Sequence, residues 1–314
     1  MTKAFEESLS LFKDKISDCI KSKKSISITT HIDCDGLTSG SIIAKALIRE
    51  GAKYTLRTSK EFSKNVVESF KTDSRDFHII TDLGGGFGKD LNQTLGDNWI
   101  ILDHHQISEE EKDNQNIINA WKYEIDGGTE ISAGGMAYFA ATALNEKNSD
   151  LSEIAIVSAL GDRQDQGDRK SFTGKNFEIS NTAKELGLVD IDLDLLLVGR
   201  ETRPLAEALA FTSQPFIEGL TWNKETCLSV LKSSGIQLKE EGRWRVPAEL
   251  NEEEKKTVIE AITKFSSDKN TSEIMAELIG YTYTFPKEDK RSFLRDGREY
   301  STMLNSCGRI NRSG

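Results

Sequence analysis

The chain has few of the residues that mark several common classes of protein. Its 314 residues include only four cysteines, and these are scattered without C-x-x-C spacing. Neither a zinc site nor a disulfide framework is therefore expected. No stretch is long and apolar enough to span a bilayer, and the first apolar residues recur at the spacing of an amphipathic helix rather than as a signal peptide. We expect a cytoplasmic protein with no membrane partner.

Basic residues are fewer than acidic residues. The 41 Lys and Arg residues are outnumbered by 51 Asp and Glu, which gives a net charge of −10. Nonspecific binding to nucleic acid depends on cations that contact phosphates, so the total argues against such a partner. The distribution argues differently, because residues 287–314 hold seven basic and four acidic side chains. This segment is either a contact for a nucleic-acid backbone or a solvated charged surface.

Histidine is scarce as well, but three of the four histidines stand in acidic clusters that follow predicted strands. The residues 25–30, 77–81 and 99–102 are short β-branched or aromatic runs bounded by polar residues, as is typical of strands. The clusters are His31-Ile-Asp33-Cys-Asp35-Gly36, Asp82, Asp103-His104-His105 and Gly161-Asp-Arg-Gln-Asp165. The carboxyl ends of parallel strands face one crevice, so these clusters are expected to converge.

Divalent cations explain why so many carboxylates would gather. Carboxylates within a few ångströms of one another raise each other's pKa unless cations neutralise them, and Mn²⁺ or Mg²⁺ suits oxygen ligands with some imidazole. A pair of such ions can activate a water and stabilise an in-line phosphoryl displacement. The pattern predicts a two-metal phosphoesterase, although Asp82 taken alone would be read as a turn or helix-cap residue.

These four motifs resemble those of the DHH phosphoesterase superfamily, and within it the archaeal RecJ-like exonucleases. The narrower resemblance rests on the segments 132–138, 201–205, 211–216, 294–300 and 304–309, so it covers nearly the whole chain. It implies two ions, Mn²⁺ or Mg²⁺, one on His31, Asp33 and Asp82, and the other on Asp35, Asp82, His104 and Asp165. It assigns His105 to the scissile phosphate, and Asp103 to the metal or to the orientation of an imidazole. Asp162 is the rival of Asp165.

Further residues are candidates for substrate binding. A helix that begins after Ser132 and includes Gly134 would offer free N–H groups to an anion. Arg200 and Arg203 either reach substrate phosphate or form ion pairs with Glu201 or Glu207. The basic segment adds Arg295, Arg298 and Arg309. Cys34, between two expected ligands, is read as a small packing residue, with a reactive or metal-contacting thiol as the alternative.

The predicted fold class is α/β, a parallel sheet flanked by helices and followed by further elements. We expect a catalytic domain at residues 1–190, a connecting helix at 191–220 with an apolar run at Leu193–Val198, and a small, mostly helical module at 221–285. Trp222 and Trp244 are expected in the core of that module rather than stacked on bases. Residues 286–314 resemble the start of a second α/β domain, which is a truncated form of a C-terminal domain that binds nucleic acid.

The resemblance implies a metal-dependent exonuclease acting on single-stranded DNA or RNA in repair or replication, with 5′–3′ polarity and release of nucleoside monophosphates. One alternative is a related enzyme that cleaves short oligonucleotides, cyclic dinucleotides or polyphosphate. Another is a replisome scaffold, like the replication-helicase relative of this family, with replication-helicase components as partners. The intact motifs argue against scaffolding alone.

Overall fold

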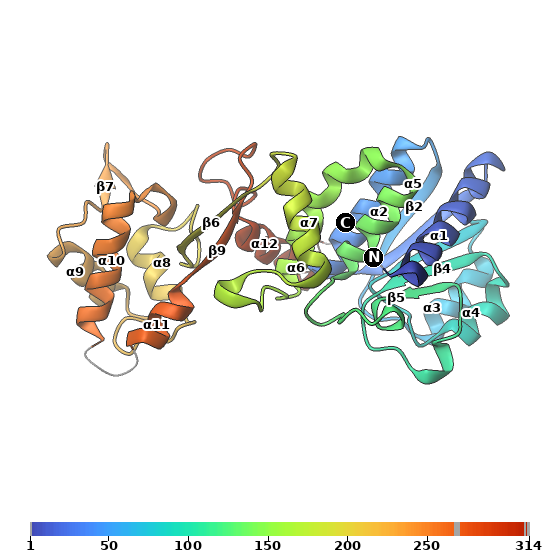
Figure 1. Ribbon diagram of the computed structural model, residues 1–314, viewed down its shortest axis with the longest axis horizontal. Coiled ribbons are helices and arrows are strands. Elements are labelled where there is room, and N and C mark those ends of the chain that lie inside the picture. Colours follow the sequence, from blue (N-terminus) through green and yellow to red (C-terminus); the bar gives the residue numbers. More distant parts are fainter. Residues whose placement is uncertain (1, 267–270, 311, 313–314) are drawn as a thin grey trace. The chain divides into compact units, whose positions relative to one another are not determined.

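The computed structural model describes residues 2–266, 271–310 and 312, which form two compact units (Figure 1). The first unit comprises residues 1–166, 172–188 and 301–314, and the second comprises residues 167–171 and 189–300. Helix α12 (Gly297–Arg309) begins in the second unit and ends in the first. The first unit thus ends close to the predicted boundary at residue 190 but also includes the end of the chain. The finer division at 221 and 286 stays a prediction.

A five-stranded parallel sheet forms the centre of the first unit, in the order β2-β1-β3-β4-β5. Its strands are β1 (Ser25–His31), β2 (Lys53–Ser59), β3 (Phe77–Thr81), β4 (Trp99–Asp103) and β5 (Ile117–Asn119). Every residue of β3 and β4 is buried, as expected for parallel strands covered on both faces. The predicted α/β class and the three predicted strands are confirmed.

Helices cover both faces of this sheet. Alternate residues of a strand point to opposite faces, so the buried residues of one strand pack against helices on both sides. Ile79 and Ile100 join the core cluster that includes α1, α2 and α5, whereas Ile80 and Ile101 pack with residues of α3 and α4. Helices α2 and α5 lie side by side (Figure 1). The helices of this unit are α1 (Lys3–Lys21), α2 (Cys34–Arg49), α3 (Lys64–Ser69), α4 (Gly88–Leu95), α5 (Ala133–Leu144), α6 (Ser152–Gly161) and α7 (Gly174–Glu185), with short 3₁₀ turns at 70–72, 109–111, 120–123 and 146–151.

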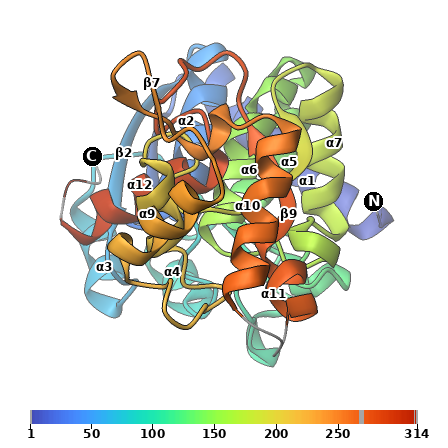
Figure 2. The same cartoon turned by 90° about the vertical axis from the view of Figure 1, so that its left-hand side faces the viewer.

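The second unit combines two antiparallel strand pairs with helices. Strand β6 (Asp190–Leu195) pairs with β9 (Ile279–Thr284). The other elements are α8 (Leu205–Phe211), α9 (Lys224–Ser233), the hairpin β7 (Lys239–Glu240) and β8 (Arg243–Trp244), α10 (Glu252–Phe265) and α11 (Thr271–Leu278), with 3₁₀ turns at 168–170 and 247–249. Helices α9 and α10 are seen together in Figure 2. Within the described residues, no helix is both long and apolar enough to cross a membrane.

Two expectations for the second unit are wrong. The apolar run Leu193–Val198 was expected to be helical, but it begins in β6 and ends in the turn after it. The alternation of Asp and Leu at 190–195 has the period of a strand, and the helix of this region is α8. Trp222 and Trp244 are not core residues, since 65% and 41% of their surfaces are exposed.

His78 of β3 lies inside the first unit, as expected for a packed strand residue. It is 1% exposed, neither ring nitrogen has a hydrogen-bond partner, and its ring packs against Phe70 at 4.6 Å between centroids. Burial lowers the pKa of His78, so the folded protein takes up a proton on this ring at a lower pH than the unfolded chain does. The unfolded chain gains a proton near pH 6.5, where the folded protein does not.

His78 should therefore not lower the free energy of unfolding above about pH 6.5. It should lower that free energy as the pH falls below this value. In His78→Phe, the free energy of unfolding should fall less steeply between pH 7 and pH 5, by at most about 1.4 kcal/mol per pH unit. Urea unfolding of metal-free protein across this range measures the slope. Equal slopes in the two proteins would show that His78 does not titrate on unfolding.

Candidate metal centre

Three of the four acidic and imidazole clusters lie where the central strands end, but the fourth, which was expected to follow a strand, follows helix α6. His31 is the last residue of β1, Asp82 follows β3, and Asp103 ends β4. Asp82 adopts a left-handed backbone conformation, with φ of 61°, and its N–H donates to Leu102 of the neighbouring strand at 3.0 Å. Aspartate tolerates this conformation better than most residues. The turn it makes keeps the carboxylate at the strand end.

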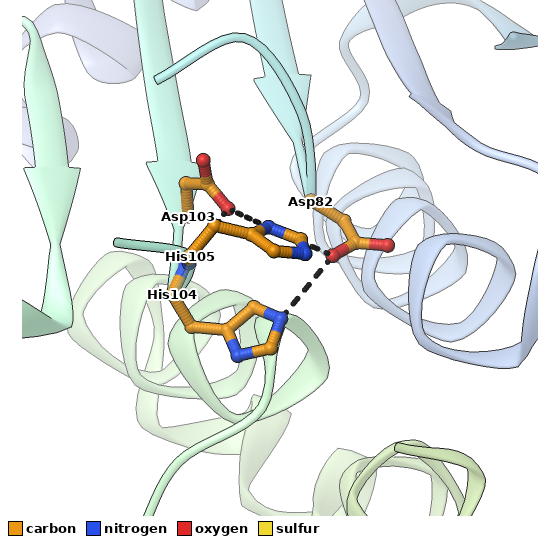
Figure 3. Close-up of side chains that lie close together, drawn as sticks. All are labelled: Asp82, Asp103, His104 and His105. Carbon is orange, nitrogen blue, oxygen red and sulfur yellow. Dashed lines mark hydrogen bonds and ion pairs between the residues drawn. The ribbon is translucent and has the colours of Figure 1, made fainter. Parts of the chain in front are cut away.

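Asp82 is the centre of the cluster (Figure 3). Its Oδ1 lies 3.4 Å from Nε2 of His104 and 3.8 Å from Nδ1 of His105, and its Oδ2 lies 3.6 Å from Nδ1 of His31. The residue is only 2% exposed. A carboxylate in this position, after β3, can reach groups at the ends of two other strands, β1 and β4.

Three sets of side chains could each hold a metal ion, with ligand atoms within 4.8 Å of one another. The sets are His31, Asp33 and Asp82; Asp35, His104 and Asp162; and Asp82, Asp103, His104 and His105. Seven of these eight residues were predicted from the sequence as metal or phosphate ligands, and the structure brings all seven together. The first and third sets share Asp82, whereas the set that holds Asp35 does not include it.

Hydrogen bonds fix the two imidazoles of the Asp-His-His motif. Nδ1 of His104 lies 2.6 Å from the carbonyl oxygen of Gly127, so Nδ1 carries the proton and Nε2 is left to bind a cation. Nδ1 of His105 lies 2.8 Å from Oδ1 of Asp103, which also accepts the backbone N–H groups of both histidines at 2.8 and 3.3 Å. Of the two roles expected for Asp103, this geometry favours the orientation of His105.

Asp35 is held by the start of α5. Its carboxylate accepts the N–H groups of Ala133 and Gly134 at 2.9 and 3.0 Å and the hydroxyl of Ser158. Ser132 caps α5 by accepting the N–H of Gly135. The expectation that Ser132 and Gly134 would offer free N–H groups to a substrate anion therefore needs correction, because the anion at this helix start is Asp35 itself.

The fourth motif places Asp162, and not Asp165, in the cluster. Helix α6 ends at Gly161, and Oδ2 of Asp162 lies 3.8 Å from Nδ1 of His104. Arg163 then takes a left-handed conformation and Gln164 is buried, which turns the chain away. Within the described residues, Asp165 belongs to none of the three sets. The geometry thus favours the rival that the sequence analysis had placed second.

Burial and mutual repulsion perturb the carboxylates when no cation is counted. Burial, aided by the charge of Asp35, raises the pKa of Asp82 to about 6 and that of Asp162 to about 7. The nearby carboxylates of Asp33 and then Asp82 raise the pKa of His31 to about 10. Such shifts are typical of a site that concentrates negative charge, which a bound cation would offset.

The donor set fits divalent cations. Oδ2 of Asp82 is buried without a hydrogen-bond partner, which is costly for a carboxylate oxygen unless a cation binds it. The other donors are carboxylate oxygens and imidazole nitrogens, the mixture that suits Mn²⁺ and related ions.

Cys34 is buried, its Sγ contacts the carbonyl oxygen of Val157, and burial raises the pKa of its thiol, so the packing role expected for it is favoured.

Most of the arginines expected to bind substrate contact other protein groups. Arg200 pairs with Asp194 at 2.8 Å and lies 3.5 Å from Glu201, one of the two partners that the ion-pair alternative named. Arg295 donates to the carbonyl of Glu288, and Arg298 to the carbonyl of Tyr281.

Two of these arginines have different surroundings. The guanidinium of Arg203 lies 4.5 Å from the ring centre of Phe211, an aromatic side chain that is 40% exposed. Arg309 is exposed at the end of α12. Substrate binding by these arginines stays a prediction.

Two site residues were missed in the sequence. The Ser158 hydroxyl binds Asp35, and it accepts the N–H of Gly134 at 3.0 Å. The buried Gln164 donates to Asp162 at 2.7 Å and to the carbonyl of Gly127 at 2.9 Å. Gln164 stands inside the fourth motif, so its position was a usable signal, whereas nothing near Ser158 in the sequence distinguishes it.

Comparisons with known proteins agree with this arrangement. A model of the DHH family, N-terminal domain, matches residues 25–161, and a model of the DHH-CID domain matches residues 197–279. An uncharacterised protein of Methanocaldococcus jannaschii is 29% identical over 310 residues, which are 94% of this chain and 65% of the relative. The chain therefore spans slightly less than two thirds of that relative.

Solved structures with related folds include CDC45 from Entamoeba histolytica, with a TM-score of 0.63 at 16% identity, covering 95% of this chain and 62% of that one. RecJ from Thermus thermophilus in complex with Mn²⁺ matches with a TM-score of 0.46 at 14% identity, covering 97% of this chain and 38% of that one.

Proposed function

We propose that this chain, which matches models of the DHH family, N-terminal domain, and of the DHH-CID domain, is a divalent-metal-dependent phosphodiesterase acting on single-stranded nucleic acid. The observation that carries this proposal is the convergence of three ligand sets around the buried Asp82. In the proposed reaction it works as an exonuclease, with 5′–3′ polarity, that releases nucleoside monophosphates in repair or replication.

The proposed roles follow the geometry of the site. His31, Asp33 and Asp82 would hold one ion, and Asp35, His104 and Asp162 the other, with Asp82 added to the second set because its Oδ1 lies 3.4 Å from His104. Two such ions, when bound, supply an activated water and neutralise charge on the phosphoryl oxygens.

His105 is assigned to the scissile phosphate. Its side chain is 60% exposed, while Asp103 fixes its ring through Nδ1. A histidine held in this way can present its other ring nitrogen to a phosphate oxygen.

A second candidate keeps the chemistry and shortens the substrate. Arg200 and Arg295, two of the groups expected to grip a long strand, are engaged in contacts inside the second unit. An enzyme in which these two arginines are not available to a long strand should hold short oligonucleotides or cyclic dinucleotides as well as it holds long chains. Replication-helicase components stay proposed partners, which pull-down with a metal-site variant would test.

The deciding experiment uses single-stranded DNA and RNA labelled at the 5′ or the 3′ end, together with a dinucleotide, in Mn²⁺, Mg²⁺ or EDTA. The proposal expects mononucleotides from the long strands, released progressively from the 5′ end and abolished by EDTA. Cleavage of the dinucleotide alone would favour the second candidate. No hydrolysis in any metal would contradict both.

A further inference from the structure

The last turns of α12 contact the loop that carries the first metal motif, within the first unit. Asn305 accepts the backbone N–H of Cys34 through Oδ1 at 2.9 Å, across 271 residues of sequence. Its Nδ2 donates to the carbonyl oxygen of Gly161 at 3.3 Å. A single amide side chain therefore joins the start of α2 to the end of α6.

These two backbone groups stand beside expected metal ligands. Cys34 is the first residue of α2 and lies between Asp33 and Asp35. Its N–H is one of the four at a helix start that have no partner inside the helix, so Asn305 satisfies a group that would otherwise be left unpaired. Gly161 ends α6 directly before Asp162. Displacement of either group would move a ligand.

Close packing accompanies these hydrogen bonds. A Cβ atom added to Gly308 would lie 2.0 Å from the carbonyl oxygen of Ile32, which real Cβ atoms do not approach so closely. A Cβ atom on Gly161 would lie 2.5 Å from Sγ of Cys34. Helix α12 can thus rest on the loop at 32–34 only because glycine occupies position 308.

We propose that Asn305 is a positioning residue of the metal centre, and that Gly308 allows the contact through which it acts. Asn305 holds the backbone of the first and fourth motifs at the separation that joint cation binding needs. This inference rests on the proposed function, since it concerns the same ions. It assigns a role in that site to a segment far from all four motifs in the sequence.

The first test measures metal binding without substrate. Asn305→Ala and Gly308→Ala should each weaken Mn²⁺ binding to the otherwise intact chain by roughly 10–100-fold, as is usual when support of metal ligands is lost. Isothermal titration with Mn²⁺ measures this. Ser306→Ala is the matched control, because Ser306 is exposed on the same helix and its hydroxyl donates to the carbonyl oxygen of Thr302, one turn earlier. The control should bind Mn²⁺ as the unmodified chain does.

The second test needs no metal. Amide hydrogen exchange in the segment 32–36 of metal-free protein should be about tenfold faster in Asn305→Ala and Gly308→Ala than in Ser306→Ala. Faster exchange with weakened Mn²⁺ binding supports the positioning role, and unchanged Mn²⁺ binding in both variants overturns it. If the unmodified chain bound no Mn²⁺, the proposed function would fail. The exchange measurement alone would then decide whether Asn305 holds the loop.

Discussion

Asp82→Asn is expected to abolish metal-dependent hydrolysis and, at the same time, to raise the thermal stability of the metal-free protein. Asp82 contributes to two of the three ligand sets, so its loss should lower the rate by roughly 10³-fold, which corresponds to about 4 kcal/mol of transition-state stabilisation. Asparagine has the same shape but no charge. A loss of activity through misfolding would not be accompanied by a gain in stability.

The gain in stability follows from the sign of the pKa shift. Burial and Asp35 raise the pKa of Asp82 to about 6, so ionised Asp82 destabilises the metal-free fold as the pH rises through that value. At pH 7.5 the melting temperature of metal-free Asp82→Asn should exceed that of the unmodified chain. The difference should be roughly 2–4 °C for each kcal/mol by which ionised Asp82 destabilises the metal-free fold.

Calorimetry with and without Mn²⁺ tests both effects. Mn²⁺ should raise the melting temperature of the unmodified chain but have little effect on Asp82→Asn, because binding to the folded state is the source of that stabilisation. Asp113→Asn, at an exposed position of the first unit, is the control and should match the unmodified chain. Full activity in Asp82→Asn would contradict the proposed metal centre.

Asp162→Asn is expected to reduce Mn²⁺-dependent hydrolysis by roughly 10²-fold or more, and Asp165→Asn to reduce it far less. The two residues stand three positions apart, but only Asp162 shares a potential metal set with Asp35 and His104. Each substitution removes one charge and keeps the shape, so the pair is its own control. The rate at saturating substrate across a Mn²⁺ titration gives the comparison.

The opposite order of effects would restore the choice that motif spacing favoured. Equal losses in both variants would indicate that the turn after α6, rather than one carboxylate, matters for activity. Gln164 gives an internal check, since it donates to Asp162 at 2.7 Å and Gln164→Leu should reproduce a part of the Asp162→Asn defect. A smaller loss is expected there because the carboxylate itself remains.

The first unit was predictable because its information is local. Short β-branched runs form strands, and the polar residues directly after them must lie at the carboxyl edge of a parallel sheet. His31, Asp82 and His104 could therefore be placed together before any contact was known, and in the structure Asp82 lies 3.6 Å from His31 and 3.4 Å from His104. Helix α5, with Ser132 as its cap, was predictable for the same reason.

The second unit shows where local patterns failed. Leu193–Val198 was read by its apolar content, although the Asp-Leu alternation before it has the period of a strand. Trp222 was placed in the core by its size, but 65% of its surface is exposed. For Arg200 the sequence left both substrate phosphate and an ion pair with Glu201 or Glu207 open, but its shortest ion pair, at 2.8 Å, is with Asp194. Partners of long side chains depend on which surfaces meet, which composition does not specify.

The sequence by itself determined the α/β class, the order of strands and helices around the motifs, and most of the candidate ligands, because period and strand-end position are properties of neighbouring residues. Only the tertiary structure grouped Asp162, rather than Asp165, with Asp35 and His104 among the described residues, turned the N–H groups of α5 toward Asp35, and brought Asn305 to Cys34. Each of these depends on how a turn or a helix packs against a distant segment, where a change of one residue or one turn selects a different side chain.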